Sequence, residues 1–500
     1  MNSDFRFAAI DAMPDIPQAA PPDWKRIAER FKAYVLNPDN RVMFVNGGGH
    51  AHFAAFHDGT GEELITLGGV VLGGIFQGED VGPYLPSIAD FYHEEHRIFL
   101  NAPRVHLVEY WYLMFVNALA ASIIRLRADE APELVPLLRT GMESLITLAH
   151  KIGYDFNDQG FDFRADAPFT NKDIFRQPDS IGGYAYLMVF AYDMFGGEHF
   201  LEEARTAMDR YLAFADNPWY EMPNGAMACL AAARLNELGG RYDIRKAVSF
   251  VFDPHQGPLH VGKWGDTEVN GLMRGWRGNL DESERKIAYS LETLILLPYL
   301  LPVLKTEPGL AAAVGKYALN AASNAGWFIP DRMPEESQST PQFTPDVPYE
   351  NLVDAFGGKS PYASGDFHGH RSVYGGAVSL WWDAVLRQTD DPYMLQWDLD
   401  RTDFLGRSES GASYTLVYNP YPQPRETVIE PRADGHGSGD GAGAAGSGLA
   451  EDDRAAGCGR TFEAVDLVTN TTVFTGGTGR MSVTVPAKQA VVLKVSVAAE

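Results

Sequence analysis

Helical segments of two kinds alternate along most of the chain, and this alternation limits the possible folds more than any other feature. Apolar residues recur at i, i+3, i+4 and i+7 from about residue 23 to about residue 390. Segments such as residues 200–215 (FLEEARTAMDRYLAFA) carry charges on one face and suit an outer layer in contact with water. Segments such as residues 109–122 (EYWYLMFVNALAAS) and 182–192 (GGYAYLMVFAY) are apolar nearly all round and must be buried on every side.

Outer and inner helices in alternation, about twelve in all, predict two concentric rings. The expected fold is therefore mainly α, with an (α/α)6 toroid over residues 1–404 as the catalytic domain. An α-solenoid would alternate in a similar way, but no sequence repeat of fixed period is visible, which argues against it.

After about residue 405 the apolar pattern changes to period two. Residues 413–422 (SYTLVYNPYP) and 489–498 (QAVVLKVSVA) are enriched in Val and Thr and read as strands. We expect residues 405–500 to form a small C-terminal antiparallel β-sandwich domain. Residues 433–457 are nearly free of large apolar side chains, so they are predicted to be a disordered insertion within it.

Composition and charge exclude several classes of protein. The formal net charge of the 500 residues is -25, and no run of Lys and Arg provides a basic patch, so nucleic acid is not an expected partner. The two cysteines, Cys229 and Cys458, suggest neither a disulfide framework nor a metal site. The N-terminus shows no secretory signal pattern, and residues 64–76 (LITLGGVVLGGIF) are too short to span a bilayer. We expect a cytoplasmic protein without a membrane segment or cofactor. Its oligomeric state stays open, with a homodimer as one option.

Acidic side chains stand among aromatic ones in several segments, and these are candidate catalytic residues. Glu109 lies within HLVEYWYLMF, where burial of a carboxylate is costly and would raise its pKa, as a general acid requires. The alternative is a Glu bonded to a neighbouring helix end. Asp266 and Glu221 lie near Trp219 and Trp264, and rings combined with carboxylates are how a protein holds a sugar. Glu221 could instead stabilise the N-terminus of the helix that follows it.

The densest group of ionisable residues is SPYASGDFHGHRSVYGG, near residue 360. Asp366 could act as acid or base, and Arg371 could hold a carboxylate with two hydrogen bonds. His368, His370 and Tyr374 lie beside them, at the expected N-terminal mouth of an inner helix. The alternative is a loop that Asp366 caps, with the histidines facing solvent.

Other polar loops are expected to contact substrate or to cap turns. NGGGHAHFAAFHD contains His50 and His52; without clear third and fourth ligands, sugar contact or a capped loop is favoured over a metal site. HEEH (residues 93–96) lacks the spacing of a zinc protease motif and is expected at a solvated helix end. Asp162 and Arg164 lie in a loop dense in Asp and aromatic residues without the EF-hand pattern.

At the level of architecture the chain resembles the (α/α)6-toroid, or six-hairpin, glycosidases. The resemblance rests on the helical pattern, the loops of aromatic and acidic residues, and the β tail FEAVDLVTNTTVFTGGTGRMSVTVPAKQAVVLKVSVA. HLVEYWY, NPWYE, PYASGD and the histidine-rich loops are similar to glucuronidase-type families that act on uronic acid ends. No catalytic motif of such a family matches residue by residue. The same ring fold serves lyases and epimerases, so the fold alone does not fix the reaction.

The sequence therefore predicts a glycoside hydrolase that cleaves a uronic-acid-containing, glucuronide-type oligosaccharide with a pair of carboxylates. The catalytic candidates are Asp366, Asp266, Glu109 and Glu221. The substrate-binding candidates are His50, His52, Trp111, Tyr112, Asp162, Arg164, Trp219, Trp264, His368, His370, Arg371 and Tyr374, and no metal ligand is expected. One alternative is a polysaccharide lyase that uses Tyr374 or the histidines beside Arg371, and another is a non-catalytic carbohydrate-binding protein. Retention or inversion stays open.

Overall fold

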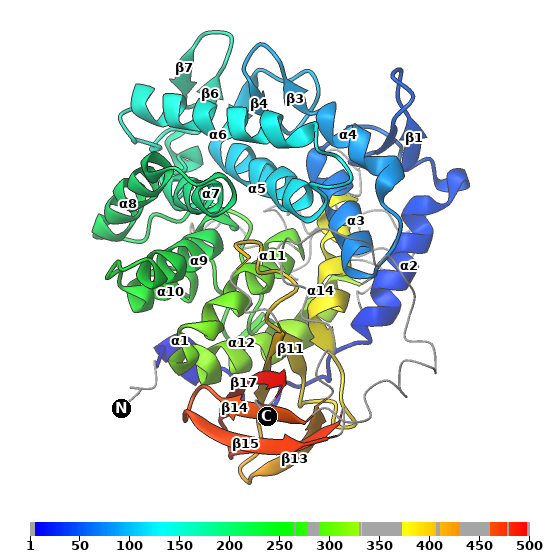
Figure 1. Ribbon diagram of the computed structural model, residues 1–500, viewed down its shortest axis with the longest axis vertical. Helices are drawn as coiled ribbons and strands as arrows, with labels where there is room; N and C mark the ends of the chain where they lie inside the picture. The colour runs from blue at the N-terminus through cyan, green and yellow to red at the C-terminus, as the bar shows by residue number, and fades with distance from the viewer. Residues whose placement is uncertain are drawn as a thin grey trace.

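The inner layer of helices closes into a ring (Figure 1). The computed structural model describes residues 6–264, 267–277, 290–329, 332, 373–406, 411–429, 461–477 and 480–497. In ring order the inner helices are α3 (Leu64–Phe76), α5 (Tyr110–Leu126), α7 (Ser180–Phe195), α9 (Asn224–Glu237), α11 (Ser290–Leu300), and the short pair α13 (Tyr374–Ala377) and α14 (Ser379–Val385). Each packs against the next, and α13 and α14 return to α3.

Glycines allow the ring to close where α3 meets α13 and α14. A Cβ atom on Gly69 would lie 2.6 Å from the Cβ of Ala377, and one on Gly73 would lie 2.5 Å from the Cβ of Leu380. Any larger residue would push these helices apart. The Gly-rich segment 64–76 is therefore a buried inner helix whose small residues are needed for close packing.

The outer helices cover the ring from outside. They are α2 (Trp24–Leu36), α4 (Leu85–Ala89), α6 (Leu134–Lys151), α8 (Glu198–Ala213), α10 (Ile244–Val251) and α12 (Ala311–Asn324), with the short α1 (Ala8–Ala12) against α12. In α2 and α8 the buried apolar residues lie along one face, and the charged residues lie on the opposite face, as in amphipathic helices. Asp23 and Asp243 cap α2 and α10 by accepting hydrogen bonds from Arg26 N (3.1 Å) and Lys246 N (2.9 Å).

Small antiparallel strand groups lie in the segments before the inner helices. They are β1 (Met43–Val45) with β2 (Ala51–Phe53); β3 (Tyr92–His93) with β4 (Ile98–Phe99); β5 (Leu107–Glu109), β6 (Gly160–Asp162) and β7 (Ala167–Phe169); and β8 (Lys263–Trp264) with β9 (Thr267–Glu268). β5 runs directly into α5. These strands therefore fix the chain where it enters the ring.

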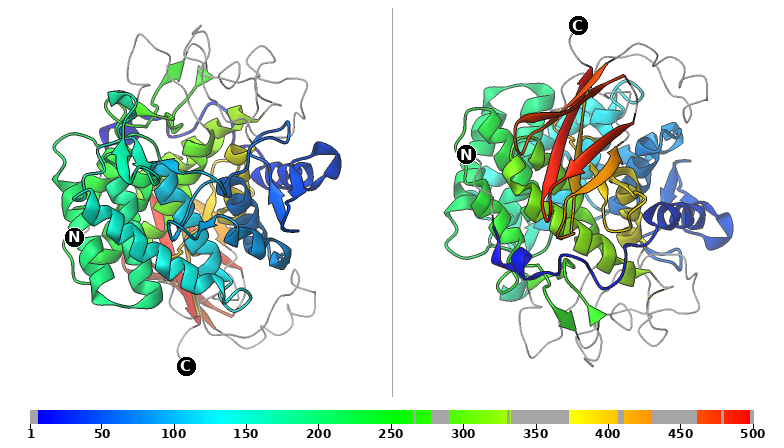
Figure 2. Two further views of the ribbon diagram at one scale, coloured as in Figure 1. Left: turned by 90° about the horizontal axis from the view of Figure 1, so that it is seen from above. Right: turned by 90° about the horizontal axis from the view of Figure 1, so that it is seen from below.

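Two antiparallel sheets form the C-terminal region. One has the order β10 (Leu386–Arg387), β11 (Gln396–Asp398), β12 (Ala412–Tyr418), β17 (Ala490–Val497), β14 (Phe462–Asp466) and β15 (Thr471–Gly476). The other pairs β13 (Arg425–Ile429) with β16 (Met481–Val485). A separate apolar core that includes Ile429, Val483 and Leu493 lies between them. In Figure 2 these sheets lie on the face of the ring opposite to β8 and β9.

The C-terminal end of the helix ring is closed by residues 399–406. The ring of Phe404 lies against Phe76, Tyr299 and Trp381, with centroid distances of 6.2, 6.2 and 6.4 Å. Thr402 Oγ1 donates a hydrogen bond of 2.6 Å to the carbonyl of Pro298 in α11. Among the described residues, side chains of this segment therefore fill the C-terminal end of the ring.

The predicted fold class, a mainly α toroid followed by an antiparallel β region, is confirmed, and the closed ring rules out a solenoid. The first sheet already takes in β10 and β11, ahead of residue 405. The predicted insertion at 433–457 lies outside the described residues. In the part of the chain that the structure describes, no helix has the length and apolar character needed to cross a membrane.

Candidate functional site

Carboxylates gather where the inner helices begin. Glu63, Glu109 and Asp179 stand at the N-cap positions of α3, α5 and α7, yet none of them caps its own helix with its side chain. Glu221 lies two residues before the N-cap of α9, and Glu292 lies in the first turn of α11. We call these five residues the rim carboxylates. Helix dipoles favour negative charge at this end, so the ring concentrates acidic groups there.

Glu109 is held in place by two glutamine side chains. Its Oε1 accepts a hydrogen bond from Gln159 Nε2 (2.8 Å), and its Oε2 accepts one from Gln177 Nε2 (2.9 Å). Gln177 Oε1 in turn accepts from the backbone N–H of Trp111 (2.8 Å), which frees Glu109 from capping α5. Burial raises the pKa of Glu109, although the two amide hydrogen bonds lower it. The raised pKa is the one expected for a Glu in this apolar context, and the role of Glu109 as a general acid stays a prediction.

Asp179 is one of three rim carboxylates, with Glu63 and Glu292, that were not predicted from the sequence. Its side chain is 1% exposed, and burial raises its pKa to about 7, against the lowering effects of the nearby backbone N–H groups of Tyr220 and Glu221 and the charge of Arg277. The available signal is similar to the one used for Glu109, a carboxylate in an apolar context: Asp179 comes directly before residues 180–195, which are apolar nearly all round.

The loop that carries Trp219 and Glu221 lies against Asp179. A small pocket is lined by Asp179, Tyr211, Asn217, Trp219, Met222 and Phe250, among others. Trp219 is 3% exposed, and its Nε1 has no hydrogen-bond partner among the described residues. Asn217 Oδ1 accepts from the backbone N–H of Trp219 at 3.1 Å and so fixes the start of this loop. The predicted residues Trp219 and Glu221 are therefore brought together with Asp179.

The two candidate histidines of the β1–β2 hairpin differ in their environment. His52 is fully buried, with Nδ1 2.5 Å from Glu62 Oε1 and Nε2 2.8 Å from Asp90 Oδ2. His50 is 35% exposed, and its Nδ1 lies 2.7 Å from the same Asp90 oxygen. Burial raises the pKa of Asp90, but hydrogen bonds from His52, His50 and Asn46 bring it below its ordinary value. His52 thus supports Glu62, next to the start of α3, while His50 remains accessible.

Four further candidates have clear local surroundings. Trp111 is buried and packs on Tyr112 with a centroid distance of 4.0 Å. Asp162 accepts hydrogen bonds from the backbone N–H groups of Arg164 (2.9 Å) and Ala165 (3.0 Å) in the β6–β7 turn. These two bonds lower the pKa of Asp162, and the side chain of Arg164 is exposed. Contact of these residues with substrate stays a prediction.

The stretch near residue 360 is described only at its end. Tyr374 begins α13, is buried, and packs edge-on against Phe56 with a centroid distance of 6.1 Å. The backbone N–H of Val373 donates to the carbonyl of Ala55 (2.7 Å), so this stretch enters the ring beside the β1–β2 hairpin. The remaining candidates lie outside the described residues, namely Asp266, Asp366, His368, His370 and Arg371, and Trp264 is placed only as part of β8.

The HEEH sequence does not lie at a helix end, and that expectation is wrong. Residues 93–97 form the turn of the β3–β4 hairpin, in which the backbone N–H of Arg97 donates to the carbonyl of His93 at 2.6 Å. Arg97 adopts a left-handed conformation with φ of 55°, which tightens the turn. Burial lowers the pKa of His96, and so do the charges of His106 and His93, whereas Glu95 raises it.

No family model and no curated protein sequence matches this chain. Among solved structures, a family 76 glycoside hydrolase from a bovine Bacteroides thetaiotaomicron strain is 12% identical, with 73% of this chain and 77% of that chain covered and a TM-score of 0.45. A sugar epimerase from a ruminal bacterium is 11% identical, with 72% and 98% covered and a TM-score of 0.44. A GH127 beta-L-arabinofuranosidase from Geobacillus stearothermophilus T6 is 9% identical, with 96% and 81% covered and a TM-score of 0.38. Likeness at this level carries no conclusion about the reaction of this chain.

Proposed function

We propose that this protein is a glycoside hydrolase that takes its substrate at the N-terminal end of the helix ring. The observation that carries this proposal is Glu109, a half-buried rim carboxylate with a raised pKa and two amide partners that fix its orientation. A general acid must hold its proton near the working pH and face the bond that it protonates. Burial shifts the pKa of Glu109 in the direction that the first condition needs, and its two amide hydrogen bonds fix its orientation, as the second condition needs.

In the proposed reaction Glu109 gives its proton to the glycosidic oxygen as the bond to the anomeric carbon breaks. A second carboxylate then activates water or attacks that carbon itself. Glu221 is the candidate for this role among the described residues, and Asp266 and Asp366 stay candidates from sequence. We assign Asp179 a positioning role, because its buried carboxylate faces the backbone N–H groups of Tyr220 and Glu221.

We also propose that the substrate contains a uronic acid. An acidic rim repels an anionic sugar unless a cation receives the sugar carboxylate. Arg277 is a half-buried cation whose charge acts on Asp179, and Arg371 is the candidate predicted from sequence. Either guanidinium could bind a carboxylate through two parallel hydrogen bonds.

The test is a panel of aryl glycosides, aryl glucuronides and uronic-acid oligosaccharides, assayed for released sugar and for ultraviolet absorbance. We expect released sugar without a new absorbance, with glucuronides preferred over the matching glucosides. An unsaturated, absorbing product would instead identify a lyase. Sugar binding without turnover would identify a binding protein. The Glu109→Gln variant, run in parallel, separates turnover by this site from a contaminating activity.

A further inference from the structure

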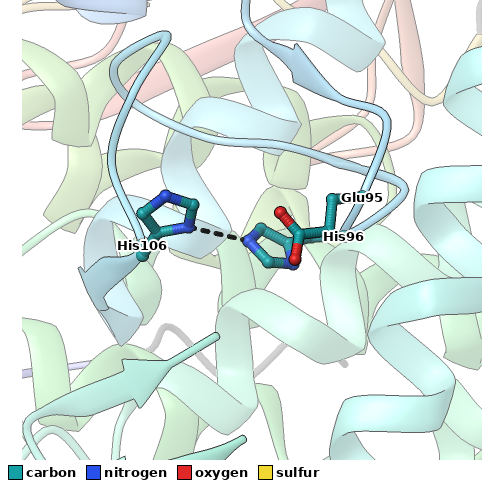
Figure 3. Close-up of side chains that lie close together, drawn as sticks. All are labelled: Glu95, His96 and His106. Carbon is teal, nitrogen blue, oxygen red and sulfur yellow. Dashed lines mark hydrogen bonds between the residues drawn. The ribbon is translucent and has the colours of Figure 1, made fainter. Parts of the chain in front are cut away.

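A cluster of side chains that could bind a metal lies between the turn of the β3–β4 hairpin and the residue before β5, apart from the residues assigned to hydrolysis (Figure 3). It consists of Glu95, His96 and His106, and one ligand atom of each residue lies within 4.8 Å of the others. His96 Nε2 and His106 Nδ1 are 3.0 Å apart, and their rings are nearly perpendicular at 85°. The turn of the β3–β4 hairpin thus places His96 next to His106, ten positions further along the chain.

The separation of the two ring nitrogens fits a shared metal ion. Zinc–nitrogen bonds measure about 2.0–2.1 Å, so two nitrogen ligands lie roughly 3.3 Å apart in a tetrahedral site and roughly 2.9 Å apart in an octahedral one. The observed 3.0 Å, which is the length of a hydrogen bond between the two rings when no ion is bound, falls between these values. Glu95 is exposed, so a change of rotamer can bring its carboxylate to bonding distance.

Neighbouring groups hold the ring of His96 and the backbone of His106 in place without a metal. The ring of His96 stacks on Phe163, with centroids 5.0 Å apart and planes at 30°, and its other neighbour is His93 at 5.9 Å. The backbone carbonyl of His106 accepts a hydrogen bond from Phe163 N at 2.8 Å. His93 itself bonds through Nε2 to the carbonyl of Ala102 (3.0 Å) and is not part of the ligand set. Ligands that are oriented in advance lose less entropy when an ion binds.

We propose that Glu95, His96 and His106 bind a divalent transition-metal ion of the zinc type. Two imidazoles and one carboxylate suit zinc and its neighbours, whereas calcium and magnesium prefer oxygen ligands alone. Three protein ligands leave at least one coordination position open, on the exposed side of Glu95. His106 precedes Glu109 by three residues, and an extended strand rises about 3.3 Å per residue, so the ion would lie roughly 10 Å along the chain from Glu109, with the two side chains on opposite faces of the strand.

The experiment uses the full chain without an affinity tag, first treated with a chelator. Zn²⁺ binding is measured by equilibrium dialysis, and Co²⁺ binding by its visible absorption. We expect about one strongly bound ion per chain, and binding at least tenfold weaker in His96→Gln and His106→Gln. His50→Gln is the matched control, because His50 is also a half-exposed imidazole beside a carboxylate.

Thermal unfolding gives a second readout that does not depend on enzyme activity. Zn²⁺ should raise the Tm of the native chain and of His50→Gln, but not that of His96→Gln or His106→Gln. The proposal is overturned if the native chain binds no Zn²⁺ at micromolar concentration. It is equally overturned if His50→Gln, rather than the two cluster variants, loses the ion. Should one variant be unstable, the other decides, since each removes a different ligand.

Discussion

The two ends of the inner helix ring handle buried charge in opposite ways. At the C-terminal end, cations meet acidic partners directly: Arg234 Nη2 lies 2.8 Å from Asp193 Oδ1. Lys305 Nζ lies 2.7 Å from Asp400 Oδ1 and 2.8 Å from Asp403 Oδ2. Burial acts to lower the pKa of Arg234, but its bonds to Asp193 raise it above the ordinary value. Helix dipoles also favour cations at this end.

At the N-terminal end the best-described carboxylates have neutral partners. Glu109 faces two glutamine amides, and Asp179 faces backbone N–H groups, with the charge of Arg277 as a smaller influence. Burial is then the largest effect, and both carboxylates have a raised pKa. One end of the ring therefore pairs its buried charges directly, whereas at the other end burial raises the pKa of two carboxylates.

The largest expected effect is the pH dependence of stability due to Asp179. Its pKa is about 7 in the folded chain and near 3.8 when unperturbed. The contribution of Asp179 to the free energy of unfolding is therefore fully present below about pH 3.8 and is lost as the pH rises towards 7. In that window the carboxyl group of Asp179 ionises in the unfolded chain but stays protonated in the folded one. Three pKa units correspond to about 4 kcal/mol. Asp179→Asn stays neutral, so its urea midpoint should exceed that of the native chain increasingly from pH 4.5 to about 7 and by a constant amount above that. Equal pH dependence in both proteins would mean that Asp179 is not held protonated.

The next effect concerns the closed end of the ring. Lys305 is 4% exposed, and Lys305→Met leaves the two aspartates without their cation. Removing one partner of a buried ion pair costs about 3 kcal/mol, so the urea midpoint should fall sharply. Activity per folded molecule should not change. The double variant Lys305→Met with Asp403→Asn should recover part of the loss. If Lys305→Met lost activity while its stability stayed unchanged, the C-terminal end of the ring would be part of the functional site.

Glu109→Gln tests the open end. Loss of a general acid typically lowers the rate at least a hundredfold, equivalent to about 2.7 kcal/mol, so kcat should fall by that factor. Stability should change little, since the substitution conserves shape. The matched control is Glu203→Gln, which alters another half-buried carboxylate, one that binds the hydroxyls of Tyr154 (2.9 Å) and Tyr184 (2.6 Å) in the outer layer. Near-native turnover by Glu109→Gln would take Glu109 out of the mechanism.

The fold class could be predicted from the sequence because a helix that is buried on all sides can be recognised from its own residues. Residues 110–126 and 180–195 are apolar all round, and such helices can only form an inner layer. Glu109 could be found for the same reason: a carboxylate before an apolar helix stands out. Asp179 carries a weaker form of this signal, since its nearest aromatic neighbours in the sequence, Phe175 and Tyr184, are four and five positions away.

Partners distant in sequence could not be predicted. Glu109 is oriented by residues 50 and 68 positions away, and that pairing depends on how β5, β6 and α7 pack. The approach of His96 to His106 depends on a hairpin turn closed by the left-handed conformation of Arg97, for which the residue type gives no cue. Hydrogen-bond partners and ligand sets of this kind are products of tertiary structure and leave no periodic trace.

The smallest expected effect separates substrate binding at the rim from packing. The indole Nε1 of Trp219 is buried beside Asp179 and has no partner among the described residues, so its loss removes no hydrogen bond within that part of the fold. If a sugar hydroxyl accepts from this N–H, Trp219→Phe loses about 1 kcal/mol of binding, which is roughly a fivefold rise in KM with kcat unchanged. The control is Met222→Phe, because Met222 lines the same pocket without an N–H donor and its replacement changes packing only. A KM that is unchanged in Trp219→Phe would assign Trp219 to the core, and a fall in kcat would place it nearer to the reacting bond.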